Sequence, residues 1–300
     1  MAGRRPERAA GNGVWLDHQA WTKIVMGACL GIIVYYQMQS KSNKEVPLAK
    51  NSEYLNGKRS QVSICAPIFK REIENLGNPE CVPARCGRAV NDGLISEKQA
   101  HSLLKLAKKG LAKGGSSGGA SIIDLHSGAL SKGENFINLY KSFPGLFQAE
   151  DFVVYNQVKE TIKDYIAEHF GIESSSLYLT HPTFFSRIEN QPAKTPHDEY
   201  WHIHIDKETY PSFHYTSLLY LTDFGEDFTG GEFVFVDVSD KLNRTIEPRL
   251  ARLSFFTSGI ENKHHVKPVI SGVRYALTLG FTCDASKAIP DPGSDEHLKI

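Results

Sequence analysis

The 300-residue sequence has no excess of either charge, because 34 lysines and arginines balance 34 aspartates and glutamates. A chain without net charge has no general electrostatic attraction to nucleic acid or to an anionic membrane surface. The sequence also contains no glycine-rich phosphate loop of the Walker type and no internal repeat. These absences argue against a nucleic-acid-binding module, a P-loop nucleotidase and a repeat array. The length fits one large catalytic domain with appendages, or two small domains.

Long uncharged apolar stretches are also scarce. The one that approaches membrane-span length lies near the N-terminus. Residues 24–36 are apolar and uncharged, and residues 21–38 approach the length of a membrane-spanning helix. Trp21 precedes the run, as an interfacial aromatic should, and an arginine cluster lies before it. The positive-inside rule then predicts a cytosolic tail over 1–20 and a signal-anchor transmembrane helix over 21–38. A cleaved signal peptide and a buried core helix are the alternatives.

Two features agree with a luminal position for the rest of the chain. Asn243 begins an Asn-Arg-Thr glycosylation sequon in a polar, loop-like stretch. Cysteine is rare, but four of the five cysteines follow the apolar run: Cys65, Cys81, Cys86 and Cys283. An oxidising compartment permits disulfides among them in three possible pairings, and a zinc knuckle on the two closest cysteines is the alternative. We expect a single-pass type II membrane glycoprotein of the endoplasmic reticulum or Golgi.

Composition divides the predicted luminal part into three segments. Residues 39–92 are polar and contain four prolines, which indicates a luminal stem. Residues 93–284 follow as the predicted catalytic domain, and residues 285–300 as a C-terminal tail.

Within the predicted catalytic domain, helical patterns come first and strands follow. Ser96 and Gln99 offer a capping box at the start of one helix. Residues 150–170 carry an apolar stripe at helical spacing, and Gly171 stops this second helix. From Leu177 onward the pattern is one of short strands and turns. This order predicts an α+β fold, a double-stranded β-helix (jelly roll) with supporting helices packed on its outside.

The most informative pattern is a His-x-Asp pair followed, sixty residues later, by a second histidine. His204 and Asp206 lie in a stretch rich in aromatic and β-branched residues, where strand alternation would place both on one face. His264 completes the set. Two imidazoles and one carboxylate make the facial triad that holds Fe(II) and leaves coordination positions open for oxygen chemistry. Arg274, ten residues after His264, suits the carboxylate of a second bound ligand.

Two neighbouring histidines compete for the metal positions. His202 shares the face of His204 by alternation, so it is either a competing ligand or a neighbour of the metal site. His265 points away from His264 if the strand is regular. The spacing to the other motif residues favours His204 and His264.

From residue 93 to about 284, the chain resembles the prolyl 4-hydroxylase and lysyl hydroxylase type of Fe(II)- and 2-oxoglutarate-dependent dioxygenase. The resemblance is carried by the His-x-Asp motif at 204–206, the strand-like run 216–222, the Gly-Gly-containing segment 230–235, and the segment 264–274. It implies Fe(II), 2-oxoglutarate as co-substrate, O2 and ascorbate (vitamin C). It also implies an oxidoreductase that releases succinate and CO2.

The same resemblance assigns roles to individual side chains. It makes His204, Asp206 and His264 the catalytic iron ligands, and Arg274 the partner of the distal carboxylate of 2-oxoglutarate. Tyr220 matches a tyrosine that donates to this carboxylate in oxygen-sensing prolyl hydroxylases, and a core aromatic is its other interpretation.

Two functions of different classes follow. The leading hypothesis is a membrane-anchored dioxygenase that hydroxylates a Pro or Lys side chain of a protein or peptide substrate in the secretory pathway. The alternative is a non-catalytic, membrane-anchored jelly-roll binding module. The complete triad with its basic partner favours the enzyme.

Overall fold

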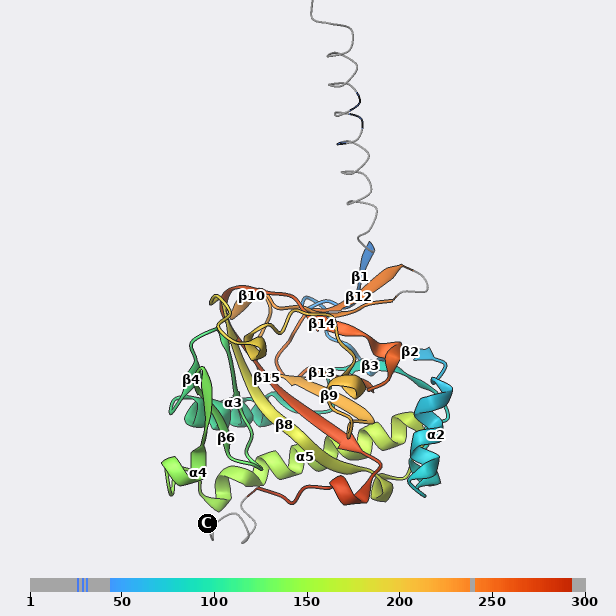
Figure 1. The fold of residues 1–300 in the computed structure, drawn as a ribbon, viewed down its shortest axis with the longest axis horizontal. Coiled ribbons are helices and arrows are strands. Elements are labelled where there is room, and N and C mark those ends of the chain that lie inside the picture. Colours follow the sequence, from blue (N-terminus) through green and yellow to red (C-terminus); the bar gives the residue numbers. More distant parts are fainter. Residues whose placement is uncertain (1–25, 27–28, 30, 32–43, 238–240, 293–300) are drawn as a thin grey trace, which may run out of the picture. The chain divides into compact units, whose positions relative to one another are not determined.

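The computed structural model (Figure 1) describes residues 26, 29, 31, 44–237 and 241–292. The chain divides into two compact units, Met1–Lys44 and Glu45–Ile300. The predicted cytosolic tail lies outside the described residues. So does the predicted anchor over 21–38, except for three residues that are helical: Met26, Cys29 and Gly31. Among the described residues, no helix combines the length and apolar character that a membrane crossing requires.

Two sheets form the framework of the second unit. The larger has the strand order β2-β3-β13-β9-β15-β8-β5-β6-β4, with β10 paired to β15 and β7 paired to β6. Its strands are β2 (Lys58–Ser63), β3 (Cys86–Asn91), β4 (Gly115–Ser116), β5 (Ala120–Ile123), β6 (Ala129–Gly133), β7 (Asn135–Asn138), β8 (Tyr178–Glu189), β9 (Tyr215–Tyr220), β10 (Phe228–Gly230), β13 (Leu253–Thr257) and β15 (Val269–Thr282). The smaller sheet has the order β1-β12-β11-β14. Its strands are β1 (Lys44–Ala49), β11 (Phe233–Phe235), β12 (Leu242–Ile246) and β14 (His264–Val266).

Helices lie along one face of the larger sheet, as Figure 1 shows for α3 and α5. The α-helices are α2 (Pro67–Asn75), α3 (Glu97–Leu111), α4 (Leu139–Ser142), α5 (Ala149–Phe170) and α6 (Asp206–Thr209). The short 3-10 helices are η1 (Pro79–Cys81), η2 (Ser174–Ser176), η3 (Pro196–Asp198), η4 (Ile260–Asn262) and η5 (Ala285–Lys287).

Both predicted long helices are present, and the predicted start of the first and end of the second are confirmed. The Ser96 side chain accepts a hydrogen bond from the Gln99 backbone, and the Gln99 side chain accepts one from the Ser96 backbone, which is the predicted capping box of α3. Gly171 ends α5 in the left-handed conformation, with φ of 67°, where a glycine has no Cβ to clash.

Strand alternation separates two hydrophobic cores. On β13, Leu253 and Phe255 pack toward the helices, whereas Phe256 faces the smaller sheet. On β9, Leu219 and Tyr220 divide in the same way between the two cores. A larger sheet with apolar residues on both faces needs a cover on each face, which the helices and the smaller sheet provide. This arrangement fits the predicted jelly roll with supporting helices.

From Glu45 onward, the predicted stem belongs to this fold, because it lies in the same compact unit as the catalytic motifs. β3 pairs with β13, and β2 pairs with β3, so residues 58–91 extend the larger sheet. The prediction of a separate stem over 39–92 is therefore corrected. The polar composition was misleading because an edge strand such as β2 carries polar side chains on its solvated side.

Two disulfides select one of the three possible pairings: Cys65 with Cys86, and Cys81 with Cys283. The first follows from the β2–β3 register, in which Ser63 lies opposite Cys86. The second joins η1 to the residue after β15. Both close cysteines of the possible zinc knuckle are used in these bonds, which removes that alternative.

Candidate functional site

The three predicted metal ligands meet in space. His204, Asp206 and His264 each offer a ligand atom, and these atoms all lie within 4.8 Å of one another. Asp206 Oδ1 lies 3.5 Å from His204 Nε2 and 3.4 Å from His264 Nε2. Two imidazole nitrogens converging on one carboxylate oxygen form the donor set that non-haem Fe(II) uses.

Backbone pairing between distant segments holds the two histidines together. The His204 N–H donates to the His264 carbonyl at 2.9 Å, and the His264 N–H donates back at 3.0 Å. This bridge is isolated, and Asp206 is already the first residue of α6. The expectation that strand alternation places His204 and Asp206 on one face is therefore wrong. A bridge followed by a helical turn, rather than alternation, brings the aspartate beside the histidine.

Backbone carbonyls orient both imidazole rings. His204 Nδ1 lies 2.9 Å from the His202 carbonyl, and His264 Nδ1 lies 2.8 Å from the Asn262 carbonyl. Since a carbonyl only accepts, each Nδ1 donates, so in the neutral ring Nε2 is the nitrogen available to a metal ion. The Asn262 side chain is itself held, since its Nδ2 donates to the Gly87 carbonyl at 3.0 Å and to the Thr257 carbonyl at 2.8 Å.

The surroundings keep Asp206 ionised and His264 neutral. Burial raises the pKa of Asp206, but His264, His204 and a hydrogen bond from Thr216 at 2.7 Å together leave it below its ordinary value. Burial lowers the pKa of His264 to about 4. Burial also lowers the pKa of His204, but the bond with Asp206 outweighs this and the net pKa is raised. The pocket therefore presents a carboxylate that attracts a cation.

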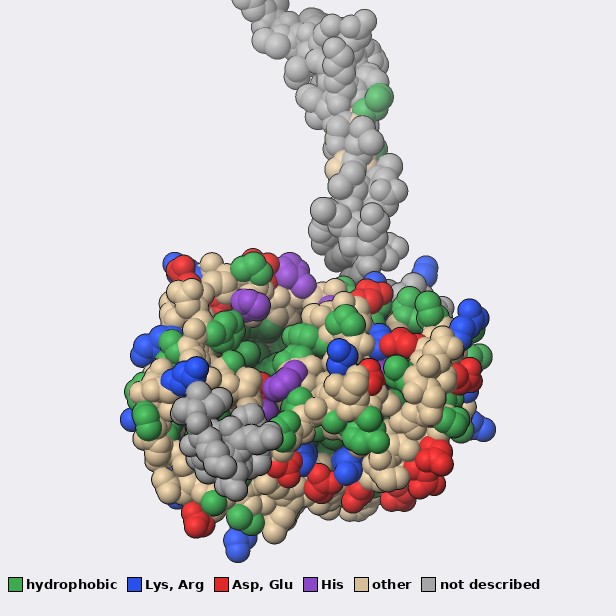
Figure 2. Space-filling view, turned by 60° about the horizontal axis from the view of Figure 1, so that its bottom comes forward, with side chains coloured by type: hydrophobic (Ala, Val, Ile, Leu, Met, Phe, Trp, Pro, Cys, Tyr) green, Lys and Arg blue, Asp and Glu red, His purple; other side chains and the backbone are tan. Residues whose placement is uncertain are grey.

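Aromatic side chains enclose one side of the site. The His264 ring stacks on Phe233 with centroids 4.8 Å apart, and Phe256 lies 5.0 Å away. The His264 side chain is 4% exposed, whereas that of His204 is 36% exposed. The site therefore opens on the His204 side. Figure 2 shows histidine side chains in and around a hollow that hydrophobic side chains border.

Arg274 and Tyr220 lie close together, and both side chains are fully buried. They lie on the paired strands β15 and β9, where Ala276 is opposite Tyr220. The Arg274 guanidinium lies 5.4 Å from the centre of the Tyr220 ring, and its Nε donates to the Gly231 carbonyl at 2.9 Å. Burial lowers the pKa of Arg274 and raises that of Tyr220.

Two buried hydrogen-bond donors lie at this position, and neither is well satisfied by the described residues. Within the described part of the chain, Arg274 Nη2 and the Tyr220 hydroxyl are buried and make no well-formed hydrogen bond. A buried cation left in this way is costly unless an anion arrives. The two donors therefore fit the carboxylate of a bound ligand.

The competing histidines lie elsewhere. His202 is exposed, and its Nε2 is 2.7 Å from Glu199. His265 lies next to His264 on β14, opposite Val234, and is not part of the cluster of ligand atoms.

Thr216 and Asn262 position the ligands, and the sequence reading did not identify them. Strand alternation on β9 offered a signal for Thr216, because it shares a face with Tyr220. Asn262 had no signal, since its side-chain partner Gly87 is distant in the sequence.

The glycosylation prediction falls on a strand. Asn243 is partly buried in β12, not in the loop that its polar surroundings indicated. Its modification remains a prediction.

The chain is similar to iron- and 2-oxoglutarate-dependent enzymes. The model of the 2OG-Fe(II) oxygenase superfamily matches residues 185–281. The 2-oxoglutarate and iron-dependent oxygenase domain-containing protein 3 of Rattus norvegicus is 46% identical over 282 residues, which are 91% of this chain and 88% of that protein. Prolyl 3-hydroxylase 2 of Homo sapiens is 45% identical over 71 residues, which are 23% of this chain and 10% of that protein.

A solved structure, a prolyl hydroxylase in complex with a hypoxia inducible factor oxygen degradation domain peptide fragment from Trichoplax adhaerens, aligns with a TM-score of 0.47. It is 15% identical and covers 73% of this chain and 93% of its own. The likeness to the rat protein spans most of both chains, and this chain clusters a His-Asp-His set. The chain therefore belongs to the 2OG-Fe(II) oxygenase superfamily and is a 2-oxoglutarate-dependent dioxygenase that uses Fe(II), 2-oxoglutarate and O2.

Proposed function

We propose that this dioxygenase hydroxylates a prolyl or lysyl side chain of a secretory-pathway protein, with release of succinate and CO2. The observation that carries the proposal is the pairing of a complete metal-ligand set with two buried donors, Arg274 Nη2 and the Tyr220 hydroxyl, that make no well-formed hydrogen bond with the described residues. The local similarity to a prolyl 3-hydroxylase supports a side chain of a protein as the substrate.

The chain's own residues would hold and orient the reactants. His204, Asp206 and His264 would bind Fe(II), because both Nε2 lone pairs and one carboxylate oxygen already converge. Arg274 and Tyr220 would bind the distal carboxylate of 2-oxoglutarate by charge-assisted hydrogen bonds. When bound, iron with its co-substrate and O2 supplies the oxidation that replaces a C–H bond by C–OH.

The surroundings of the ligands would keep this chemistry ordered. Thr216 fixes the Asp206 carboxylate, and the carbonyls of residues 202 and 262 fix the two rings. Phe233 and Phe256 exclude water from the His264 side. The exposed His204 side is then where a substrate side chain would enter. Ascorbate would serve as the reductant that restores Fe(II).

We also propose the position of the enzyme in the cell: a type II membrane protein of the endoplasmic reticulum or Golgi, anchored by residues 21–38, with a luminal catalytic domain. The two disulfides support an oxidising compartment. Protease treatment of sealed microsomes should spare the region after Met38 and remove the residues before Trp21. The substitution Asn243→Gln should remove a glycan. Digestion of the catalytic domain in intact microsomes would contradict this orientation.

Anaerobic addition of Fe(II) and 2-oxoglutarate to the full chain tests the site. We expect a visible metal-to-ligand charge-transfer band, and we expect His204→Ala, Asp206→Ala and His264→Ala each to abolish it together with 2-oxoglutarate turnover. The matched control is His265→Ala, which should keep the band. A wild-type chain without a band would favour the binding module, and loss of the band in His265→Ala alone would overturn the ligand assignment.

A further inference from the structure

The outer edge of β2 has no partner strand. β2 ends the larger sheet and pairs only with β3 among the described strands. Folded proteins usually shield such an edge, because its free N–H and C=O groups can pair with another chain. The first two residues of β2, Lys58 and Arg59, carry the charges that commonly shield an edge, but the other end does not.

The uncharged end of β2 is followed by exposed hydrophobic side chains. Val62 is 60% exposed, Ile64 is 93% exposed, and Ile68 at the start of α2 is 75% exposed. A single exposed apolar residue is ordinary, but three within seven positions of the chain, beside a free strand edge, form a patch. Such patches mark sites of protein contact.

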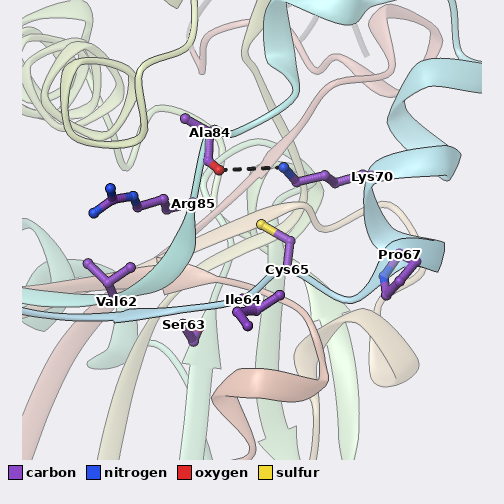
Figure 3. Close-up of a pocket in the computed structure, with 8 residues that line it drawn as sticks. All are labelled: Val62, Ser63, Ile64, Cys65, Pro67, Lys70, Ala84 and Arg85. Carbon is purple, nitrogen blue, oxygen red and sulfur yellow. Dashed lines mark hydrogen bonds between the residues drawn. The ribbon is translucent and has the colours of Figure 1, made fainter.

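A surface cavity of about 490 Å³ accompanies this patch (Figure 3). It is lined by Val62, Ser63, Ile64, Cys65, Pro67, Lys70, Ala84 and Arg85. Lys70 reaches across and donates to the Ala84 carbonyl at 3.4 Å, and Arg85 is exposed. These two cations are the charged residues of the lining, and no carboxylate is among the described lining residues. The cavity is therefore apolar with two positive charges, which complements an acidic segment.

A neighbouring cavity shares part of this lining, and its own lining includes the carboxylates Asp237 and Glu261. This second, polar cavity of about 220 Å³ shares Val62 and Ser63 with the first and extends to Gly87 and Asn262. Asn262 is the residue whose carbonyl accepts from His264 Nδ1. Material bound along β2 would thus end close to the backbone that supports a proposed iron ligand.

We propose that the free edge of β2 and the cavity lined by Lys70 and Arg85 dock an extended acidic segment of the protein substrate. The segment would add a strand to β2, so that main-chain hydrogen bonds supply affinity and alternate side chains supply specificity. Glutamate or aspartate side chains would face Lys70 and Arg85, and apolar ones would cover Ile64. This inference rests on the proposed function, because it gives the enzyme a docking site apart from the residue that is hydroxylated.

The test is a binding measurement on the full chain. The probe is a short, end-blocked, fluorescent peptide in which glutamate alternates with valine, and the comparison peptide has lysine in place of glutamate. Fluorescence anisotropy should show that the acidic peptide binds and the basic peptide does not. The affinity for the acidic peptide should fall as the salt concentration rises. The double variant Lys70→Glu/Arg85→Glu should weaken binding roughly tenfold, and Ile64→Asp several-fold.

The matched control is Lys98→Glu/Lys105→Glu, which makes the same charge change on exposed positions of α3 and should bind the peptide as wild type does. The charge-transfer band should persist in all these variants, so loss of docking is distinguishable from failure of the iron site. Equal binding of both peptides, or unchanged binding in the β2-side variants, would overturn the proposal. It would equally be overturned if those variants instead abolished self-association in sedimentation, or binding to phosphatidylserine vesicles.

Discussion

Arg252 and Arg274 are both almost completely buried, at 0% and 1% exposure, but their surroundings differ. Arg252 donates five hydrogen bonds: two to the carboxylate of Asp92, and three to the carbonyls of Lys50, Glu53 and Glu247. A guanidinium has five N–H groups, so every donor has an acceptor. Arg274 has one such bond, to the Gly231 carbonyl, and its Nη2 is buried without a well-formed hydrogen bond in the described part of the chain.

The comparison separates a structural cation from one that we propose binds a ligand. The bonds of Arg252 tie the segment 50–53 and the end of β3 to the loop before β13, which explains why the predicted stem is part of the fold. The unsatisfied donor of Arg274 serves no such purpose. The folded chain tolerates this buried donor because the surrounding sheets are stable enough to hold it in place for an anion.

Removing the partner of the structural arginine should have the largest effect. Asp92→Ala leaves the Arg252 charge buried and uncompensated, so we expect the free energy of unfolding to fall by about 3–5 kcal/mol. Denaturant unfolding of the full chain measures this change. The control is Arg59→Ala, which breaks the exposed Arg59–Glu53 pair and should cost less than about 1 kcal/mol. A loss as small as the control's would mean that the two arginines do not differ as described.

Replacing Arg274 should weaken ligand binding but leave the free energy of unfolding unchanged. Arg274→Ala should weaken 2-oxoglutarate binding by roughly ten- to hundredfold, because a charge-assisted hydrogen bond contributes about 1.5–3 kcal/mol. Arg274→Lys keeps the charge but loses the bidentate fork. Its affinity for 2-oxoglutarate should therefore lie between those of wild type and Arg274→Ala. Anaerobic titration of the Fe(II)-loaded chain measures the affinity. Unchanged affinity would move the role to another cation, although Lys267 already pairs with Glu45 at 2.6 Å.

His169 is a partly buried basic side chain, and unlike the two arginines it can lose its proton near neutral pH. Burial lowers the pKa of His169 to about 4, and its Nδ1 is buried without a hydrogen bond in the described residues. The unfolded chain binds this proton near pH 6.5, so the stabilisation is complete above pH 6.5 and is lost as the pH falls toward 4. We expect a loss of roughly 1–2 kcal/mol from this residue, after allowing for its partial exposure.

The measurement for His169 is the pH dependence of unfolding, compared between wild type and His169→Leu. The difference in free energy of unfolding between the two chains should be constant above pH 6.5 and should change as the pH falls from 6.5 toward 4. A constant difference over that range would show that the pKa of this ring is the same in the folded and unfolded chains, and would contradict the prediction.

The smallest effect should come from the second donor beside Arg274. Tyr220→Phe removes one neutral hydroxyl, so 2-oxoglutarate affinity should fall several-fold, which corresponds to about 1 kcal/mol. The free energy of unfolding should stay the same or rise, because a buried hydroxyl without a well-formed bond is lost. Wild-type affinity in Tyr220→Phe would assign this side chain to the core alone.

Features that depend on neighbours in the chain could be predicted from sequence. The capping box of α3 and the glycine that ends α5 involve residues within one helical turn, so short-range chemistry determines them. The metal ligands could be predicted because their chemical types are few and their spacing is characteristic, and the family resemblance added the assignments of Arg274 and Tyr220.

Residue types and their spacing therefore predicted the candidate metal ligands and the local helix ends. The tertiary structure decided the rest: the disulfide pairing, the inclusion of residues 45–92 in the fold, and the contribution of Asn262 to the orientation of His264. These depend on which distant strands meet, and Gly87 and Asn262 come together only because β3 pairs with β13. The tertiary structure also distinguishes Arg252 from Arg274. The two side chains have the same chemistry and differ only in the acceptors that folding brings within reach.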